Sequence, residues 1–294
     1  MSRYSIKDLE QLSGIKAHTL RIWEQRYSFI NPKRTDTNIR FYDENDLKLV
    51  LNISLLKDNG HKISSISKMC NEEMQQEVVK LTEEKLSYPE QIHALTLAMI
   101  DYDEEQFDKI MSANAIQYGF EKTMMDLIYP FLNKIGYMWQ TGAVCPSQEH
   151  FISNLVIQKL HAAIEGLPAG PGKMKSKFLL FLPDGEHHEL SLLFAWYLLK
   201  VRNYQVIYMG EHIDPKYLKK VYKMQQPEYI FTVFTACRNA ACNSEDFINE
   251  LSDEFSHSKI LITGRQVVDH NIEVPGNVVI MHEFMDLVKF CTTV

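Results

Sequence analysis

The spacing of hydrophobic positions changes twice along the chain, and these changes divide it into three regions. Short helical patterns separated by turns fill residues 4–70. Long helical patterns run from 88 to 165, and beyond 173 short apolar runs alternate with amphipathic stretches. Because apolar positions recur about every 3.6 residues in a helix and every two in a strand, the three regions are predicted to fold differently.

The first region begins with a pair of short predicted helices, at 6–12 and 17–27, and Gly14 ends the first of them. Such a pair forms a helix-turn-helix, whose second helix can enter the major groove of DNA, although helical hairpins of other function share this pattern. Ile22 and Trp23 are assigned to the hydrophobic core of this module.

A basic, turn-rich loop at 31–42 follows and ends in an alternating strand, after which helices are predicted at 44–59 and 63–69. Residues 1–75 carry 12 Lys and Arg against 10 Asp and Glu, whereas the whole chain has a net charge of −7. A locally basic module on an acidic body indicates that contact with nucleic acid is confined to that module.

The middle region is predicted to be a four-helix bundle, because short loops make consecutive helices antiparallel neighbours. A polar connector at 71–87 precedes helices at 89–100, 104–117, 120–140 and 147–165. Ser147 is expected to cap the last helix, which puts Glu149 and His150 in its first turn. Taken alone, Trp139 and Glu149 at this end of the bundle are a packed aromatic ring and a capping carboxylate.

The third region follows a Gly- and Pro-rich linker at 166–172. Strands are predicted at 177–182, 204–209, 229–234, 259–262 and 278–281. Helices are predicted at 187–202, 215–225, 240–255 and 283–291. This alternation indicates a parallel sheet covered on both faces, as in flavodoxin-like folds. The fold class predicted for the whole chain is therefore multidomain, α followed by α/β.

Composition limits the cellular context. Of 294 residues, 45% are hydrophobic and 23% charged, and no apolar run approaches the ~20 residues that span a bilayer. The N-terminus has no signal-peptide core, and five cysteines without a Cys-x-x-Cys pair favour free thiols. These features predict a cytoplasmic protein without a membrane partner.

The loop after the first predicted strand, at 183–186, concentrates polar side chains together with the helical turn that follows it. It lies at the carboxyl edge of the predicted sheet, where α/β folds bind ligands. The loop and turn carry Glu186, His187 and His188. A neutral imidazole oriented by a carboxylate binds metals well, whereas an isolated His-His pair in an acidic loop is more often solvated.

Four motifs in the first region carry a family resemblance. They are Thr19-Leu-Arg-Ile-Trp-Glu-Gln-Arg-Tyr27, Arg40-Phe-Tyr42, Asp46-Leu47 and Gly60-His-Lys-Ile-Ser-Ser-Ile66. Together they resemble the winged helix of MerR-type transcriptional regulators, which implies a double-stranded DNA operator as partner. The candidate DNA contacts are cations and hydroxyl donors, which can bind phosphates: Thr19, Arg21, Arg26, Lys33, Arg34, Arg40 and Tyr42. Each of these side chains, taken alone, is equally typical of a solvated surface.

The pattern Glu186-x-His188-x-x-Ser191 is similar to the Asp/Glu-x-His-x-x-Gly signature of cobalamin-binding domains, with Ser191 in place of glycine. This resemblance implies that His188 is the lower ligand of the cobalt of cobalamin and that Glu186 orients it. It also places three residues beside the nucleotide tail of the cofactor: Thr232, Thr263 and Gly264. Ser191 and Thr263 each add a side chain where the tail is expected to pass closely.

Trp139 is followed, after nine residues, by Glu149-His150. This spacing is similar to the motif with which light-responsive regulators of the CarH/LitR type cover the upper face of adenosylcobalamin. The resemblance implies adenosylcobalamin as the cofactor, with these three residues forming its cap. Those relatives have a histidine after the tryptophan, whereas this chain has Gln140, whose amide is a poorer ligand for Co(III) than an imidazole.

Three domains are therefore expected. They are a MerR-type winged helix at 1–75, a helical connector and four-helix bundle at 76–168, and a cobalamin-binding Rossmann-like domain at 173–294. The preferred interpretation is a DNA-binding transcriptional regulator, a repressor and not an enzyme, that senses light or cobalamin through bound adenosylcobalamin. By the same resemblance it is a homo-oligomer, either a dimer or a tetramer.

Two other interpretations stay open on the residues alone. In the first, Ser191 and Thr263 indicate that the third domain has lost the cofactor, so that a MerR-type regulator acts through a protein partner. In the second, residues 89–294 are a cobalamin carrier for methyl transfer or a mutase. The second is harder to sustain, because the chain has no barrel to activate a substrate and an attached winged helix is unexplained there.

Overall fold

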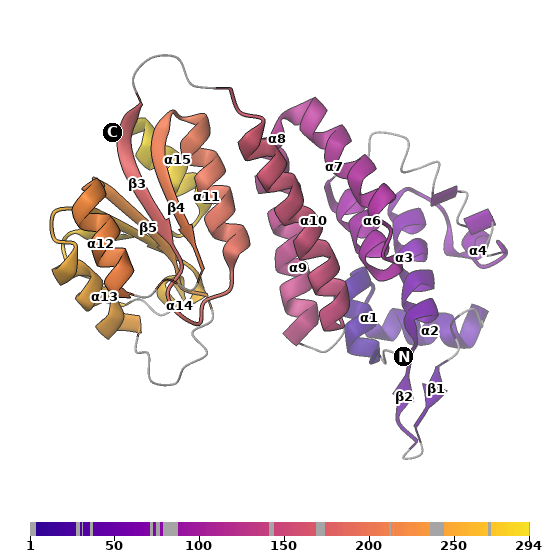
Figure 1. The fold of residues 1–294 in the computed structure, drawn as a ribbon. Coiled ribbons are helices and arrows are strands. Elements are labelled where there is room, and N and C mark those ends of the chain that lie inside the picture. The colour runs from indigo at the N-terminus through magenta and orange to yellow at the C-terminus, as the bar shows by residue number, and fades with distance from the viewer. Residues whose placement is uncertain are drawn as a thin grey trace. The chain divides into compact units, whose positions relative to one another are not determined.

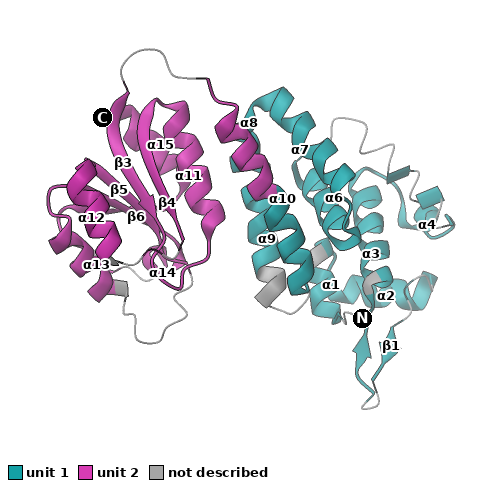
Figure 2. Cartoon of the chain, in the orientation of Figure 1, with its two compact units in different colours: residues 1–155 teal, residues 156–294 magenta. Residues whose placement is uncertain are grey.

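The computed structural model describes residues 4–27, 30, 32–35, 38–70, 73–74, 77–78, 88–140, 144–168, 174–211, 213, 215–235, 244–269 and 272–293. Figure 1 shows the elements in these ranges, and Figure 2 shows two compact units, residues 1–155 and 156–294. The predicted fold class, α followed by α/β, is confirmed. No helix in the described part of the chain combines the length and apolarity needed to cross a membrane.

The first unit opens with the predicted helix-turn-helix, α1 (Ile6–Ser13) and α2 (Ala17–Tyr27). Gly14 ends α1 in the left-handed conformation, with a φ of 74° that glycine adopts without strain. The Glu10 carboxylate then accepts from the Ala17 N–H at 3.0 Å. This bond satisfies a backbone donor at the start of α2 and fixes the turn between the two helices.

The core of this module is built from one face of α2. Leu20 and Trp23, three residues apart, are buried together, so the prediction for Trp23 is confirmed. The prediction for Ile22 is wrong, because its side chain is 51% exposed. Ile22 falls on the outer face of the helix beside Arg26, which the 3.6-residue period places away from the Leu20–Trp23 stripe.

The predicted wing is a small antiparallel sheet of β1 (Lys33–Arg34) and β2 (Arg40–Phe41). Directly after it, Tyr42 forms a backbone bridge with Tyr4 at the start of the chain, which ties the wing to the helix-turn-helix. The predicted helices follow as α3 (Glu44–Asp58) and α4 (Ile63–Ile66).

The rest of the first unit is helical, as predicted, and most of the predicted connector at 71–87 lies outside the described residues. The helices are α6 (Tyr88–Asp101), α7 (Glu104–Tyr118), α8 (Phe120–Thr123), α9 (Tyr129–Gln140) and the first half of α10 (Pro146–Glu165), which continues into the second unit. A π-helical turn, η1 (Met124–Ile128), joins α8 to α9. The prediction that Ser147 caps the last helix is wrong, because α10 starts at Pro146 and Ser147 lies inside its first turn. Proline suits the first helical position, where no backbone N–H is needed.

The DNA-binding module and the helical segment pack against each other within this unit. α1 contacts α9, and α3 contacts α6. Lys48 of α3 forms an ion pair with Asp101 at the end of α6. The helix-turn-helix is therefore attached directly to the helices that follow it in the sequence.

The second unit holds the predicted parallel sheet, with strands in the order β4-β3-β5-β6-β7. The strands are β3 (Lys175–Phe181), β4 (Tyr204–Gly210), β5 (Tyr229–Val233), β6 (Lys259–Thr263) and β7 (Val278–Ile280). This is the flavodoxin-like order, in which the first strand lies between the second and the third. The order therefore reverses at β3 and β5, and ligands of such folds bind in the crevice at that switch point.

Helices cover both faces of this sheet (Figure 1). They are α11 (Glu189–Val201), α12 (Pro215–Gln225), α13 (Ser244–Glu254), α14 (Arg265–Val268) and α15 (Phe284–Thr293). The rings of Phe194 in α11 and Phe284 in α15 have centroids 4.9 Å apart, so these two helices share one face. α12 and α13 pack on the other face in a common apolar core with the sheet. The residues before Ser244 in the helix predicted at 240–255 lie outside the described residues.

Candidate functional site

The loop between β3 and α11 is organised around one buried carboxylate. Glu186 is 3% exposed, and its Oε1 accepts from the backbone N–H groups of His187 and His188 at 2.9 and 3.0 Å. Its Oε2 accepts from the Thr235 N–H at 2.6 Å, in the loop after β5. Glu186 therefore joins the two loops that flank the switch point, and its backbone bonds satisfy a carboxylate that is otherwise costly to bury.

The same carboxylate orients His188. The His188 Nδ1 is hydrogen-bonded to Glu186 Oε1, which makes Nδ1 the donor and leaves the lone pair of a neutral ring on Nε2. The imidazole is 47% exposed, and within the described residues no hydrogen bond to Nε2 is recorded. Its Nε2 is therefore free to face solvent, while the bond at Nδ1 fixes the direction of the ring.

The neighbouring histidine is held differently. His187 Nδ1 lies 3.5 Å from Glu211 Oε2, at the limit of hydrogen bonding, and that carboxylate is partly exposed. Glu211 follows the edge strand β4, whereas Glu186 lies at the switch point itself. The two histidines, adjacent in sequence, therefore differ in the burial and the fixation of their carboxylate partners.

A donor set of one imidazole fits cobalamin. The corrin ring supplies four nitrogen ligands to cobalt, so a single well-oriented imidazole is what the protein must add from one side. A carboxylate bonded to the second ring nitrogen is the usual arrangement behind a metal-binding histidine. The loop after β3 thus has the chemistry that a cobalt ligand requires.

The residues predicted beside the nucleotide tail lie at the carboxyl ends of the central strands. Thr232 in β5 is fully buried, and its hydroxyl has no hydrogen-bond partner among the described residues. Thr263 ends β6, and its hydroxyl donates to the Met281 carbonyl at 2.8 Å. Ser191 is partly buried in the first turn of α11.

The packing of the backbone itself requires glycine at position 264, independently of any ligand. Its φ is 109°, and an added Cβ would lie 2.3 Å from the Phe234 carbonyl oxygen. The backbone after β6 therefore passes the loop after β5 too closely for any side chain.

The predicted cap residues belong to the first unit. Trp139 lies in the last turn of α9, but its side chain, like that of Gln140, is outside the described residues. Glu149 and His150 lie together at the start of α10, with His150 Nδ1 3.0 Å from Glu149 Oε2. The other oxygen of Glu149 accepts from the Ser153 hydroxyl at 2.6 Å.

Six of the seven predicted DNA contacts lie at or near the surface of the winged helix: Thr19, Arg21, Arg26, Lys33, Arg34 and Arg40. Within this group Lys33 pairs with Asp43 and Arg34 donates to Asn38, so some of these cations also stabilise the wing. The basic surface that the sequence predicts on α2 and the wing is therefore present.

Tyr42 differs from the phosphate contact expected of it. It is 1% exposed, and its hydroxyl donates to the Glu24 carboxylate of α2. Burial and this bond raise the pKa of Tyr42 above its usual value. Its role in this structure is to join the wing to the second helix of the helix-turn-helix.

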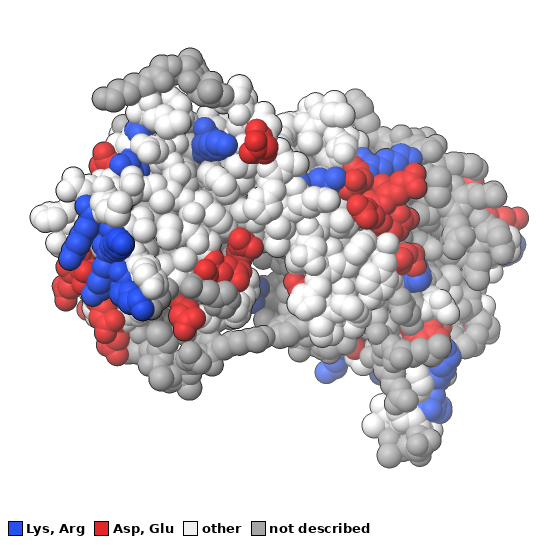
Figure 3. All heavy atoms as spheres, viewed as in Figure 1, with Lys and Arg blue, Asp and Glu red and all other residues white. Residues whose placement is uncertain are grey.

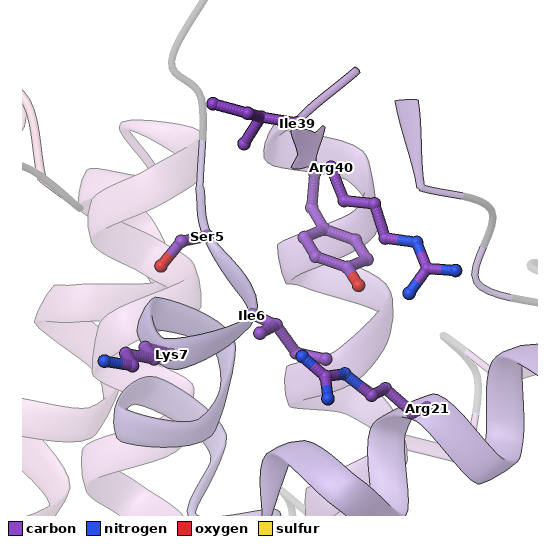
Figure 4. A pocket seen from close by; sticks show the side chains of 7 residues that line it. Ser5, Ile6, Lys7, Arg21, Ile39 and Arg40 are labelled. Atoms are coloured by element: carbon purple, nitrogen blue, oxygen red, sulfur yellow. The ribbon is translucent and has the colours of Figure 1, made fainter. Parts of the chain in front are cut away.

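A pocket of about 370 Å³ lies where the start of α1, α2 and the wing meet (Figure 4). It is lined by Ser5, Ile6, Lys7, Arg21, Ile39, Arg40 and Tyr42. Two of the predicted contacts, Arg21 and Arg40, thus come together from different elements. Lys7 lies at the same pocket and is a further cation that sequence reasoning missed, because α1 shows no basic cluster of its own.

Two segments of the chain are similar to known protein families, one in the winged helix and one in the helical part that follows it. Residues 4–73 match the MerR HTH family regulatory protein family. Residues 91–164 match the B12 binding domain family.

Individual proteins resemble the chain over most of its length. The HTH-type transcriptional repressor CarH of Myxococcus xanthus is 25% identical over 255 residues, covering 85% of this chain and 83% of CarH. The repressor CarA of the same organism is 25% identical over 253 residues, 84% of this chain and 81% of CarA. The monomethylamine corrinoid protein of Methanosarcina barkeri has a TM-score of 0.52 at 14% identity, covering 70% of this chain and 99% of that chain, and it supports the fold alone.

Proposed function

We propose that this protein is a DNA-binding transcriptional regulator, a repressor, that senses cobalamin. The exposed cations of α2 and the wing and the likeness to the repressors CarH and CarA support the DNA-binding role. The observation that carries the cobalamin role is the Glu186–His188 pair at the switch point. The match of residues 91–164 to B12 binding domains supports it independently.

In this proposal His188 Nε2 would bind the cobalt, while Glu186 holds the Nδ1–H and fixes the direction of the ring. Ser191, Thr232, Thr263 and Gly264 border the nucleotide tail. Trp139, Glu149 and His150 cap the upper face, which makes adenosylcobalamin the form bound. When bound, that cofactor supplies a photolabile cobalt–carbon bond, and hence sensitivity to light.

The packing of the first unit offers a route from the cap to DNA. Trp139 lies in the last turn of α9, and α9 contacts α1 of the helix-turn-helix. A ligand that holds α9 in one position also biases the position of α1, because packed helices move as rigid bodies. Occupancy of the cap thereby changes DNA affinity and the dimeric or tetrameric assembly that we propose for the bound state.

The test compares His188→Ala with His187→Ala in protein mixed with adenosylcobalamin in the dark. We expect His187→Ala to bind with the wild-type absorption spectrum. His188→Ala is expected to bind no cofactor, or to show the spectrum of cobalamin that keeps its own base on cobalt. The opposite pattern would show that the ligand is assigned to the wrong histidine.

The same samples decide between the proposal and its alternative. Wild-type protein that stays colourless with added cobalamin, yet binds DNA, would favour a regulator whose third domain acts through a protein partner. Operator binding is therefore measured with and without cobalamin, in the dark and after green light. A DNA affinity that changes neither with cobalamin nor with light would contradict the sensing role.

A further inference from the structure

Two helices of opposite charge lie side by side on one face of the second unit. Lys219 of α12 and Glu254 of α13 form an ion pair at 2.8 Å. One residue beyond α13, the Phe255 ring lies 4.6 Å from that of Tyr222 in α12. The two helices therefore share a continuous outer surface over the sheet (Figure 1).

The charges on this surface are segregated by helix. α12 carries lysines and no acidic residue: Lys216, Lys219, Lys220 and Lys223. α13 carries acidic residues and no lysine or arginine: Glu245, Asp246, Glu250, Asp253 and Glu254. Figure 3 shows the lysines gathered over α12, directly beside acidic side chains.

The two helices present matching stripes. Lys216, Lys220 and Lys223 follow one another at i, i+4 and i+7, and so do Asp246, Glu250 and Asp253. Residues at this spacing share one face of a helix and span about two turns. All six side chains are exposed.

Five of these nine charges have no recorded partner within the described residues. In the described part of the structure no ion pair or side-chain hydrogen bond is recorded for Lys220, Lys223, Asp246, Glu250 or Asp253. Lys219 bridges the two helices at their shared edge. The unpaired cations and anions therefore form a surface whose complement is the same surface on another molecule.

We propose that this α12–α13 surface docks a second copy of the chain. Both helices return from one parallel strand to the next, so they run in the same direction. A two-fold axis along the groove between them lays α12 of each copy over α13 of the other. Because Lys219 is level with Glu254 and Tyr222 with Phe255, this axis brings Lys216 opposite Glu250 and Lys220 opposite Asp253 of the other copy. Such an isologous interface forms each of these two lysine–acid pairs twice.

Two further observations favour this occupant. The acidic stripe of α13 repels a polyanion, so the lysines of α12 do not form a free nucleic-acid surface. The exposed side chains of Tyr217 and Met224, seven residues apart on α12, add apolar area that a protein partner covers.

The experiment reverses one charge of each stripe, Lys220 and the Asp253 that faces it, in the full-length protein and measures self-association by sedimentation velocity, without cobalamin. Lys220→Glu and Asp253→Lys each place like charges opposite one another, twice per dimer. We expect each single variant to associate about tenfold more weakly, which corresponds to about 1.4 kcal/mol. The double variant, and an equal mixture of the two single variants, should recover wild-type association.

The matched controls are Lys289→Glu and Glu283→Lys on and beside α15, on the opposite face of the sheet, where both side chains are exposed. They are expected to leave association unchanged. Recovery in the double variant, together with weakening of the wild-type dimer by salt, supports the interface.

The proposal is overturned if the wild-type protein is monomeric at all concentrations, or if the double variant associates no better than the single ones. It is also overturned if Lys220→Glu weakens DNA binding without changing association, because the stripe would then bind nucleic acid. None of these results depends on whether the chain binds cobalamin.

Discussion

Replacing Glu186 with glutamine tests the histidine loop without changing its shape. The carboxylate accepts three backbone N–H groups and the His188 ring, through both of its oxygens. Glutamine keeps one acceptor oxygen and turns the other position into a donor. Whichever way the amide is turned, at least one buried N–H faces another donor and loses its partner.

The size of the effect follows from these contacts. A buried donor left without a partner costs about 1–3 kcal/mol, which a domain stable by about 5–15 kcal/mol tolerates. The bond to the His188 ring also loses its charge, and charge-assisted hydrogen bonds are about twice as strong as neutral ones. We therefore expect a folded protein whose cobalamin affinity is about 10- to 100-fold lower, as for other partners of metal-binding histidines.

The control is Glu211→Gln, which makes the same chemical change beside His187. It should bind cobalamin with wild-type affinity. Affinity is measured by absorbance titration, and hydrogen exchange of residues 183–188 reports whether the loop stays ordered. An equal loss in both variants, or none in Glu186→Gln, would refute the assignment of Glu186 as the residue that orients the ligand.

Three further predictions concern other parts of the chain. Arg40→Ala should weaken binding to every DNA sequence and lower the salt slope by about one unit, whereas Tyr42→Phe should not change that slope, because the tyrosine hydroxyl is already bonded to protein. Burial lowers the pKa of Lys134 from 10.5 to about 8, so the unfolded chain holds this proton more tightly and stability rises with pH between those values. Lys134→Met should therefore be more stable than the wild type by about 3 kcal/mol at neutral pH. Denaturant titrations should show this difference disappear as the pH approaches the pKa of the unfolded lysine, and a difference that does not change with pH would show that burial of the charge is not its cause. Thr232→Val should stabilise the cofactor-free protein by about 1 kcal/mol and weaken cobalamin binding, and unchanged binding would remove Thr232 from the site.

The order of elements could be predicted from the sequence because local signals agree with the fold. Gly14 ends α1 where the pattern of apolar positions stops, and the strands β3 to β7 fall within a few residues of their predicted ranges. The flavodoxin-like order follows from alternating strands and helices, since parallel neighbours need crossover helices. Periodicity also explains the error at Ile22, which is apolar but lies off the buried stripe of α2.

The contacts of the site could be predicted only where they join residues that are close in sequence. The contact between Glu186 and His188 lies within three residues, so the motif contains it. The bond from Tyr42 to Glu24 joins residues 18 apart, and the bond from Thr235 to Glu186 joins residues 49 apart. No local pattern reports such pairs, and for this reason the burial of Tyr42 and the anchoring of Glu186 were not foreseen.

The interpretation in which the third domain has lost its cofactor rests on two added side chains, Ser191 and Thr263. In the structure the Thr263 hydroxyl is used by the fold itself, since it donates to the Met281 carbonyl beside it. The Thr232 hydroxyl, in contrast, is fully buried and has no partner in the part of the chain that the structure describes. In a module that only binds a protein partner, an unpaired hydroxyl at the carboxyl end of the central strand would have no function. Valine would fit at this position and would avoid the free-energy cost of burying an unpaired hydroxyl. A ligand that offers a hydrogen-bond acceptor at that point gives the hydroxyl a function, which favours the interpretation with a bound cofactor.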